Sequence, residues 1–169
     1  MPEYRQARTE EDLAKVRELF WEYLQWANGR VHEEFGVSFD IATMLEDDMR
    51  RLDIYFPPSG RLLLISEDGQ SAGLACLKKL RDGVGEVKRM YVRAEYRGRG
   101  LGRGVLEALL SEARKIGYST VRLDSARFMK AAHSLYRSAG FREIEQYDES
   151  EIPPDFREHW IFMEKTLAQ

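Results

Sequence analysis

A six-residue segment rich in glycine and arginine, Arg97–Gly102, carries the strongest chemical signal in the sequence. It lies between the apolar run Val87–Val92 and the helical pattern Val105–Ala113, where a strand should lead into a helix. Its three glycines allow the backbone to adopt positive φ and to approach a ligand closely. The first N–H groups of the following helix lack partners within that helix, and the helix dipole places partial positive charge beside them. The segment therefore predicts a binding site for a diphosphate group.

The spacing within this segment separates it from two common phosphate-binding patterns. Arg103 stands where a G-x-G-x-x-G dinucleotide fingerprint would need glycine, and no Gly-Lys-Ser/Thr follows as in a Walker loop. The order Arg97-x-x-Gly100-x-Gly102 instead resembles the R/Q-x-x-G-x-G/A segment of the GNAT superfamily of N-acetyltransferases. In that family, backbone amides of this segment hold the pyrophosphate of acetyl-coenzyme A. Arg97, Arg99 and Arg103 would add fixed positive charge there.

Two further segments strengthen the resemblance. Glu86–Arg93 is similar to the strand that contacts acetyl-coenzyme A in the family, and Ala132–Phe141 matches the family's A-x-x-L-Y-x-x-x-G-F ending. The three matches follow the family's order and together span roughly residues 84–142. One position departs from the family: Met129 stands seven residues before Tyr136, where the family often has asparagine.

The resemblance implies a fold, a cosubstrate and a set of contacts. We expect an α/β (α+β) GNAT fold over residues 1–169 as a single domain, with a mixed, mostly antiparallel central sheet of about seven strands flanked by about four helices. The cosubstrate would be acetyl-coenzyme A. The sheet would splay after the strand Glu86–Arg93, so that a backbone N–H there faces the thioester carbonyl. The residues expected to bind the cosubstrate are Met90, Tyr91, Val92, Arg97, Gly98, Arg99, Gly100, Leu101, Gly102, Arg103 and Ala132.

Acetyl transfer to an amine needs a group that protonates the departing thiolate and a group that accepts a proton from the amine. By its place in the motif, Tyr136 is the candidate acid, because a phenol with a pKa of about 10 can donate to a thiolate. Packing on the buried face of the last helix is the structural alternative. Glu86 is the candidate base, directly or through water, although a solvated ion pair with Lys88 would explain it equally well. Asp124, at the end of the next strand, competes with Glu86.

Two observations leave these roles open. Regular alternation places Glu86 and Met90 on one face of their strand, but a β-bulge would exchange the faces. His133 lies one helical turn before Tyr136 and could face the same cleft, but an exposed surface position is the favoured interpretation.

The remaining pattern predicts the elements that carry these residues. Thr9 is the predicted N-cap of an amphipathic helix that ends near Asn28–Gly29, and a second helix follows Asp40. Such helices overhang the acceptor cleft in the family, and the large side chains that could line it are Trp21, Trp26 and Phe35. Core or surface packing is the favoured interpretation for all of them. The other predicted elements are strands at Tyr4–Ala7, Leu62–Ile65, Ala72–Leu80, Glu86–Arg93, Tyr118–Asp124, Phe141–Tyr147 and His159–Lys165, and helices at Leu101–Ile116 and Met129–Ala139.

Composition argues against several other function classes. With 26 basic and 29 acidic residues, the net charge of −3 gives no indication of a nucleic acid or an anionic membrane as partner. Cys76 is the only cysteine, so neither an internal disulfide nor a multi-cysteine zinc site can form, and its apolar context indicates a core residue rather than a nucleophile. The three histidines show no metal-ligand spacing, so we expect no metal. The sequence shows no signal-peptide or membrane-spanning pattern, and we expect a cytoplasmic protein.

The sequence therefore predicts an acetyl-coenzyme A-dependent N-acetyltransferase that acts on a primary amine of a small molecule or peptide by direct transfer in a ternary complex. The alternative from another class is a non-catalytic module that binds or senses acyl-coenzyme A. The acceptor stays open between a polyamine, an amino acid or antibiotic amine, and a protein amino terminus or lysine. Dimers are common in the family, so a homodimer is an assembly that the resemblance allows.

Overall fold

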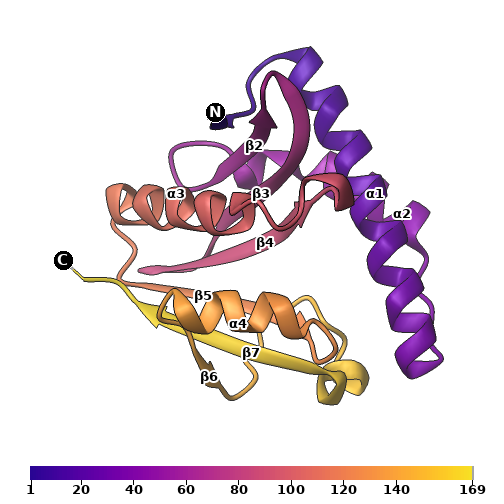
Figure 1. Ribbon diagram of the computed structural model, residues 1–169. Coiled ribbons are helices and arrows are strands. Elements are labelled where there is room, and N and C mark those ends of the chain that lie inside the picture. Colours follow the sequence, from indigo (N-terminus) through magenta and orange to yellow (C-terminus); the bar gives the residue numbers. More distant parts are fainter. Residues whose placement is uncertain (169) are drawn as a thin grey trace.

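The computed structural model describes residues 1–168 of the chain. The strands of this range form one sheet in the spatial order β1-β2-β3-β4-β5-β7-β6 (Figure 1). These strands are β1 (Pro2–Gln6), β2 (Arg61–Glu67), β3 (Gln70–Arg81), β4 (Val84–Val92), β5 (Thr120–Ala126), β6 (Arg142–Ile144) and β7 (Trp160–Thr166). The α-helices are α1 (Glu10–Phe35), α2 (Ile41–Arg50), α3 (Leu101–Ile116) and α4 (Lys130–Ser138). Short 3₁₀ helices lie at Leu52–Tyr55, Ala94–Tyr96 and Pro154–His159.

The strand pairing confirms the predicted sheet. β1 to β4 form an antiparallel meander, and β7 pairs antiparallel with both β5 and β6. β4 and β5 run parallel. The sheet is thus mixed and mostly antiparallel, and the described residues contribute seven strands and four α-helices to the fold. The predicted closing strand pair is present as β6 and β7, with β7 inserted between β5 and β6.

The first helix is longer than the sequence predicts. It begins after Thr9, as predicted, but the predicted end near Asn28–Gly29 is wrong, because the helix continues to Phe35. It ends at Gly36, which adopts φ +71° and donates its N–H to a carbonyl of the last turn. Burial of Val31 offsets the modest cost of a glycine inside a helix. Neither α1 nor any other helix of the described residues is both long enough and apolar enough to cross a membrane.

The sheet separates two apolar cores. Alternate residues of β2 and β3, such as Ile65 and Leu77, pack with the leucines of α3 on one face. Their neighbours, such as Leu64 and Cys76, pack with α1 on the other face. In Figure 1, α3 and α4 lie in front of the sheet and α1 runs along one side of it. Cys76 is therefore a buried core residue, as predicted, and burial raises the pKa of its thiol.

β4 and β5 pair over a short distance and then separate. Their parallel pairing covers Val84–Glu86 on β4 and Thr120–Arg122 on β5. Beyond these residues β4 continues along β3, while β5 continues along β7. The sheet therefore opens between its two halves.

A β-bulge marks the place where β4 turns away. Tyr91 lies opposite Leu74 on β3, and Lys88 lies opposite Cys76, so two residues of β4 face a single residue of β3. An extra residue of this kind bends a strand and increases its local twist. The bulge contains Arg89, which adopts φ +54°. Outside glycine, the only other positive φ in the described chain is found at Asp68, in the turn between β2 and β3.

Arg89 is held by two carboxylates from different parts of the chain. Its Nε and Nη2 donate to Asp48 of α2 at 2.8 and 3.0 Å, and its Nη1 and Nη2 donate to Glu151 at 2.7 and 3.3 Å. Its side chain is 5% exposed. We call Arg89, Asp48 and Glu151 the arginine clasp. Its charge-assisted hydrogen bonds offset the roughly 1 kcal/mol that a left-handed conformation costs an L-residue.

The clasp and the strained backbone can be separated by substitution. Arg89→Gly and Arg89→Ala both remove the cation that pairs with Asp48 and leave Glu151 paired with Lys88 alone, which should lower the free energy of unfolding by about 3 kcal/mol. Alanine must also adopt the positive φ, so Arg89→Ala should be less stable than Arg89→Gly by about 1 kcal/mol. Urea unfolding of both variants measures this difference.

A matched pair at Lys79, an exposed position of β3, provides the control. There the order should reverse, because alanine is favoured over glycine inside an ordinary strand. Equal stability of the two Arg89 variants, or a more stable alanine variant, would contradict the strained conformation.

Candidate active site

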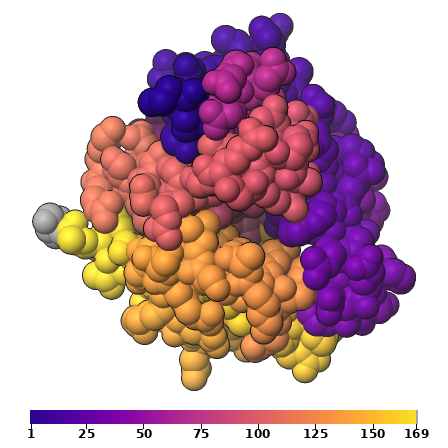
Figure 2. Space-filling view, in the orientation of Figure 1, coloured from indigo at the N-terminus to yellow at the C-terminus, as the bar shows by residue number. Residues whose placement is uncertain are grey.

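A cavity of about 730 Å³ lies where β4 and β5 separate. Its walls come from α1, α2, β4, β5, the start of α4 and the segment that carries Glu151. Figure 2 shows the surface hollowed between α1, the loop before α3, and α4. Met90 and Tyr91 both line the cavity although they pack against opposite cores of the sheet. The cavity therefore passes through the opening and reaches both faces.

The bulge decides which side chains of β4 share a face. Val87 belongs to the core beneath α3, and Met90 and Val92 pack against that same core. Tyr91 packs against the core beneath α1. Regular alternation would have put Met90 on the face of Glu86, and the extra residue exchanges the two faces beyond Arg89.

Asp124 of β5 presents a carboxylate to the cavity. Its Oδ2 accepts a hydrogen bond from Ser150 Oγ at 3.0 Å and lies 3.8 Å from Lys88 Nζ. Its Oδ1 has no hydrogen-bond partner in the part of the chain that the structure describes. Lys88 also pairs with Glu151 at 2.9 Å. Burial lowers the pKa of Lys88, but Glu151 and Asp124 outweigh burial and hold that pKa above its ordinary value, so Lys88 stays charged.

Glu86 of β4 does not line the cavity. It is 1% exposed, so the solvated ion pair considered from the sequence is wrong. The Tyr147 hydroxyl donates to its Oε2 at 2.7 Å, and Lys78 Nζ lies 3.8 Å from its Oε1. Burial raises the pKa of the Glu86 carboxyl. Of the two candidate bases, Asp124 is the one that the structure brings to the cavity surface.

Tyr136 of α4 lines the cavity from the other side. Its ring packs with Phe141 at a centroid distance of 5.9 Å, and its hydroxyl donates to no group of the described residues. Burial raises the pKa of the phenol, so the hydroxyl keeps its proton through the neutral range. The preference for an exposed His133 is wrong, because the ring is 3% exposed and is hydrogen-bonded to Ser125 at 3.1 Å.

The glycine-rich segment begins beside the cavity, at Arg97. Gly98 and Gly100 adopt φ +79° and +82°, and a Cβ on either would meet no heavy atom within 4 Å. α3 begins directly after Gly100, without a side-chain cap. The backbone N–H groups of residues 98–103 find no acceptor within the described chain. These amides are free donors at a helix N-terminus, beside open space.

The arginines of this segment have partners within the protein. Arg97 donates from Nε to the Val92 carbonyl at 2.8 Å and lies over the Trp26 ring, 5.2 Å from its centroid. Arg99 donates to a carbonyl of the preceding 3₁₀ helix at 3.2 Å, and Arg103 donates to a hydroxyl of α4. They supply positive charge around the amides, while the amides are the free donors.

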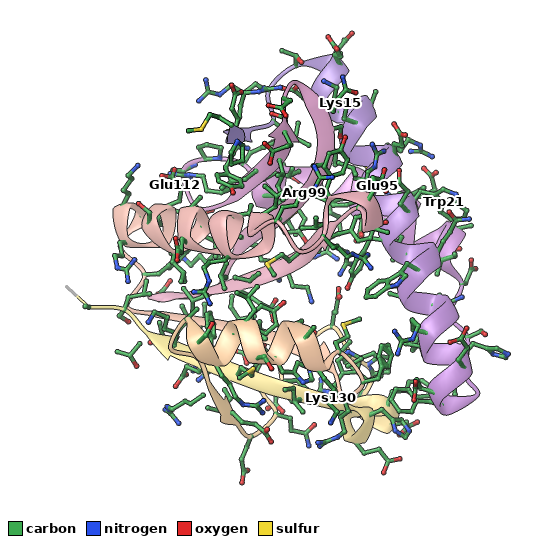
Figure 3. The ribbon with its side chains drawn as sticks, viewed as in Figure 1. Lys15, Trp21, Glu95, Arg99, Glu112 and Lys130 are labelled. Atoms are coloured by element: carbon green, nitrogen blue, oxygen red, sulfur yellow. The ribbon has the colours of Figure 1, made fainter. Side chains whose placement is uncertain are left out.

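The other predicted site residues divide into those that line the cavity and those that do not. The residues named from the sequence that line it are Trp26, Met90, Tyr91, Val92, Arg97, Asp124, Met129, Ala132 and Tyr136. The predicted contacts Gly98, Arg99, Gly100, Leu101, Gly102 and Arg103 lie outside the lining. Leu101 is 2% exposed in the core beneath α3, so its amide is the part that is free to bind a ligand. Trp21 borders a shallow groove between α1 and α2, and Figure 3 shows it at the outer edge of α1. Phe35 stacks on His159 at 4.1 Å, outside the cavity lining.

Sequence reasoning missed the arginine clasp. Asp48 and Glu151 lie 41 and 62 residues from Arg89, and neither belongs to a recognisable motif. Three or more histidine, cysteine, aspartate or glutamate side chains that could hold a metal ion do not gather anywhere in residues 1–168.

Comparison with known proteins places these features in a family. The model of the acetyltransferase (GNAT) family matches residues 13–141. An uncharacterised N-acetyltransferase of Schizosaccharomyces pombe is 32% identical over 146 residues, which cover 85% of this chain and 84% of the relative. The structure of a GNAT-family acetyltransferase from Staphylococcus aureus superposes with a TM-score of 0.76 at 18% identity, covering 99% of this chain and 100% of that one. The PaiA N-acetyltransferase of Thermoplasma acidophilum, solved with coenzyme A, gives a TM-score of 0.74 at 19% identity and covers 99% of each chain. The family model matches most of the chain, and the relative is similar over most of both chains, so the chain belongs to the GNAT family of N-acetyltransferases.

Proposed function

We propose that the protein transfers the acetyl group of acetyl-coenzyme A directly to a primary amine of a small molecule or peptide, with both substrates bound together. One observation carries the proposal: a single cavity runs through the opening of the sheet, from the glycine-rich segment at Arg97 to the carboxylate of Asp124. Two substrates that enter from different faces would meet beside the bulge of β4. Cys76 is buried in the core beneath α1, which supports a route without an acyl-enzyme.

The free amides of residues 98–103 fit the diphosphate of acetyl-coenzyme A. The positive φ of Gly98 and Gly100 and the open space beside them let the backbone approach an anion. Arg97, Arg99 and Arg103 lower the electrostatic cost of holding two negative charges. Met90, Val92 and Ala132 give the cavity an apolar lining, along which the chain between the diphosphate and the thioester of acetyl-coenzyme A would reach the bulge.

The chemistry needs three groups at the bulge. The amine nitrogen attacks the thioester carbonyl, so that a C–N bond forms and the C–S bond breaks. A backbone N–H near residues 90–92 stabilises the oxyanion, a contribution of about 3 kcal/mol in comparable sites. Asp124 accepts the proton of the amine, and Tyr136 returns a proton to the departing thiolate.

Binding of acetyl-coenzyme A tests the glycine-rich segment. Gly100→Val puts a β-branched residue at φ +82°, which forces the loop to move and displaces its amides. The dissociation constant of acetyl-coenzyme A should rise at least about 100-fold, because several charge-assisted hydrogen bonds of about 1.5–3 kcal/mol each are lost. Gly69→Val is the matched control, with φ +78° and equally open space in the turn between β2 and β3. Isothermal titration of both folded variants should show the loss in Gly100→Val alone, and equal affinities would refute the assignment.

The hydroxyl of Tyr136 tests the proposed acid. Tyr136→Phe keeps the ring and its packing, and kcat should fall by about 100-fold, the usual effect of removing a general acid. Affinity for acetyl-coenzyme A should change little, because the hydroxyl acts as charge develops on sulfur. Tyr118→Phe, which removes a hydroxyl that donates to the Ser59 carbonyl, provides the control. Turnover of Tyr136→Phe at the wild-type rate would leave the tyrosine as a packing residue.

The choice between the two carboxylates is tested by their pH profiles. Asp124→Asn should lower kcat/KM by at least about 100-fold at neutral pH and recover as the pH approaches the pKa of the free amine, because the amine then needs no base. Glu86→Gln should keep kcat/KM within about ten-fold and keep the wild-type profile, since Glu86 lies outside the cavity. The opposite pattern would make Glu86 the base through a water molecule, as the sequence first indicated.

These experiments also separate the enzyme from a non-catalytic acyl-coenzyme A-binding module. A module would bind acetyl-coenzyme A through the same amides, yet it would release no free thiol with any amine of a broad library. Binding without turnover would therefore overturn the proposed reaction and retain the cosubstrate site.

A further inference from the structure

The end of the cavity beyond the bulge combines an ionic group with an apolar wall. The ionic group consists of Asp48, Lys88, Arg89, Asp124 and Glu151, which all line the cavity and pair with one another. It holds two cations and three carboxylates, so it carries one excess negative charge. An ammonium ion is attracted to such a group, and a carboxylate is repelled by it.

Both cations of the ionic group are already paired with carboxylates of the protein. Arg89 donates hydrogen bonds to Asp48 and Glu151, and Lys88 lies within ion-pair distance of Glu151 and Asp124. A substrate carboxylate placed here would have to displace a carboxylate from one of these two buried cations, which is unfavourable. The free atom at this place is an acceptor, the Oδ1 of Asp124.

The apolar wall adjoins the ionic group along two segments. Ala126 lies two residues beyond Asp124 on β5, and Ile152 follows Glu151 directly. The side chains that form the wall with them belong to one hydrophobic cluster and include Val31, Phe39, Phe128 and Trp160.

The rings of this wall are held in place by rings behind them. Phe39 packs edge-on against Phe156 at 5.3 Å, and Phe128 stacks on Phe35 at 5.8 Å. A wall of this kind is ordered before a ligand arrives, so an apolar ligand body loses little affinity to reorganisation of the protein.

Three further cations line the cavity beside this wall. Arg51 and Lys130 are exposed, so solvent and salt screen them, and Figure 3 shows Lys130 at the start of α4. Arg30 lies over the Phe128 ring, 4.6 Å from its centroid, and its charge is paired with Glu33 and Glu34 of α1.

We infer that the acceptor is a primary amine on an apolar body, best an aryl ring joined through one or two methylenes, without a carboxylate next to the amine. The inference rests on the proposed function, because it names the acceptor of that reaction. The amine lies toward Asp124, and the aryl body lies against Phe128 and Ile152. Polyamines fit poorly, since their second ammonium ion would face the apolar wall, and α-amino acids fit poorly, since their carboxylate would face Asp124 and Glu151.

The experiment measures kcat/KM at saturating acetyl-coenzyme A for 2-phenylethylamine, ethylamine, spermidine and phenylalanine, each expressed per concentration of unprotonated amine. Burial of the ring should favour 2-phenylethylamine over ethylamine by about 100-fold. Because 2-phenylethylamine lacks the carboxylate of phenylalanine, its kcat/KM should be higher than that of phenylalanine by at least about ten-fold. A short peptide with amino-terminal phenylalanine is a further probe, which distinguishes a peptide source of the same aryl amine from a free small molecule.

A pair of variants ties the selectivity to the wall. Ile152→Asn puts a polar group into the lining and should lower the ratio of kcat/KM between 2-phenylethylamine and ethylamine by about ten-fold. Ile144→Asn changes a residue that is half-buried in the same cluster but lies outside the lining, and its ratio should equal that of the wild type. The ratio does not depend on the fraction of folded protein, so loss of stability cannot imitate the effect.

The outcomes separate this inference from the proposed function. The inference would be overturned if kcat/KM for ethylamine, spermidine or phenylalanine equalled or exceeded that for 2-phenylethylamine. The proposed acetyl transfer would stand in that case. An unchanged ratio in Ile152→Asn would overturn the inference as well. Absence of thiol release with every amine, in protein that binds acetyl-coenzyme A, would overturn both the inference and the proposed reaction.

Discussion

The separation of β4 from β5 is the constraint on which the rest of the structure depends. β4 remains paired with β3 beyond the three residues that it shares with β5, and the bulge at Arg89 turns it away. Arg89 accepts an unfavourable φ there, and the arginine clasp compensates for it with ion pairs to α2 and to the segment before Pro154. The same few residues thus open the sheet, create the cavity and connect two of its walls.

The ionic group of the cavity shows how buried charge is tolerated in this fold. Lys88 and Arg89 are each less than 10% exposed, and both lie within ion-pair distance of at least two carboxylates. Pairing offsets part of the desolvation cost of each buried cation, whereas a buried ion left without a partner destabilises a fold by about 3–5 kcal/mol. The side chains that hold these buried cations are also the ones from which we infer the choice of acceptor, so substitution of Asp48 or Glu151 should change stability as well as that choice.

The glycine-rich segment was predictable because its signal is local. Positive φ at Gly98 and Gly100 and unpaired amides at a helix start follow from residue type and from the geometry of any helix N-terminus. Glycine alone was a weaker guide in α1, where Gly29 and Gly36 carry the same local signal for a helix end. Packing of Val31 against β5 and β7 residues of its cluster selects Gly36.

The sequence by itself determined the family, the order of strands and helices, the backbone of the glycine-rich segment, the place of Tyr136 on the last helix and the core position of Cys76. These depend on residue type and short-range periodicity. Tertiary structure decided which carboxylate reaches the cavity and which face each β4 residue takes, because one inserted residue inverts the alternation of a strand. It also decided the arginine clasp, since Asp48 and Glu151 approach Arg89 from elements that are 41 and 62 residues away and carry no local signal of that contact.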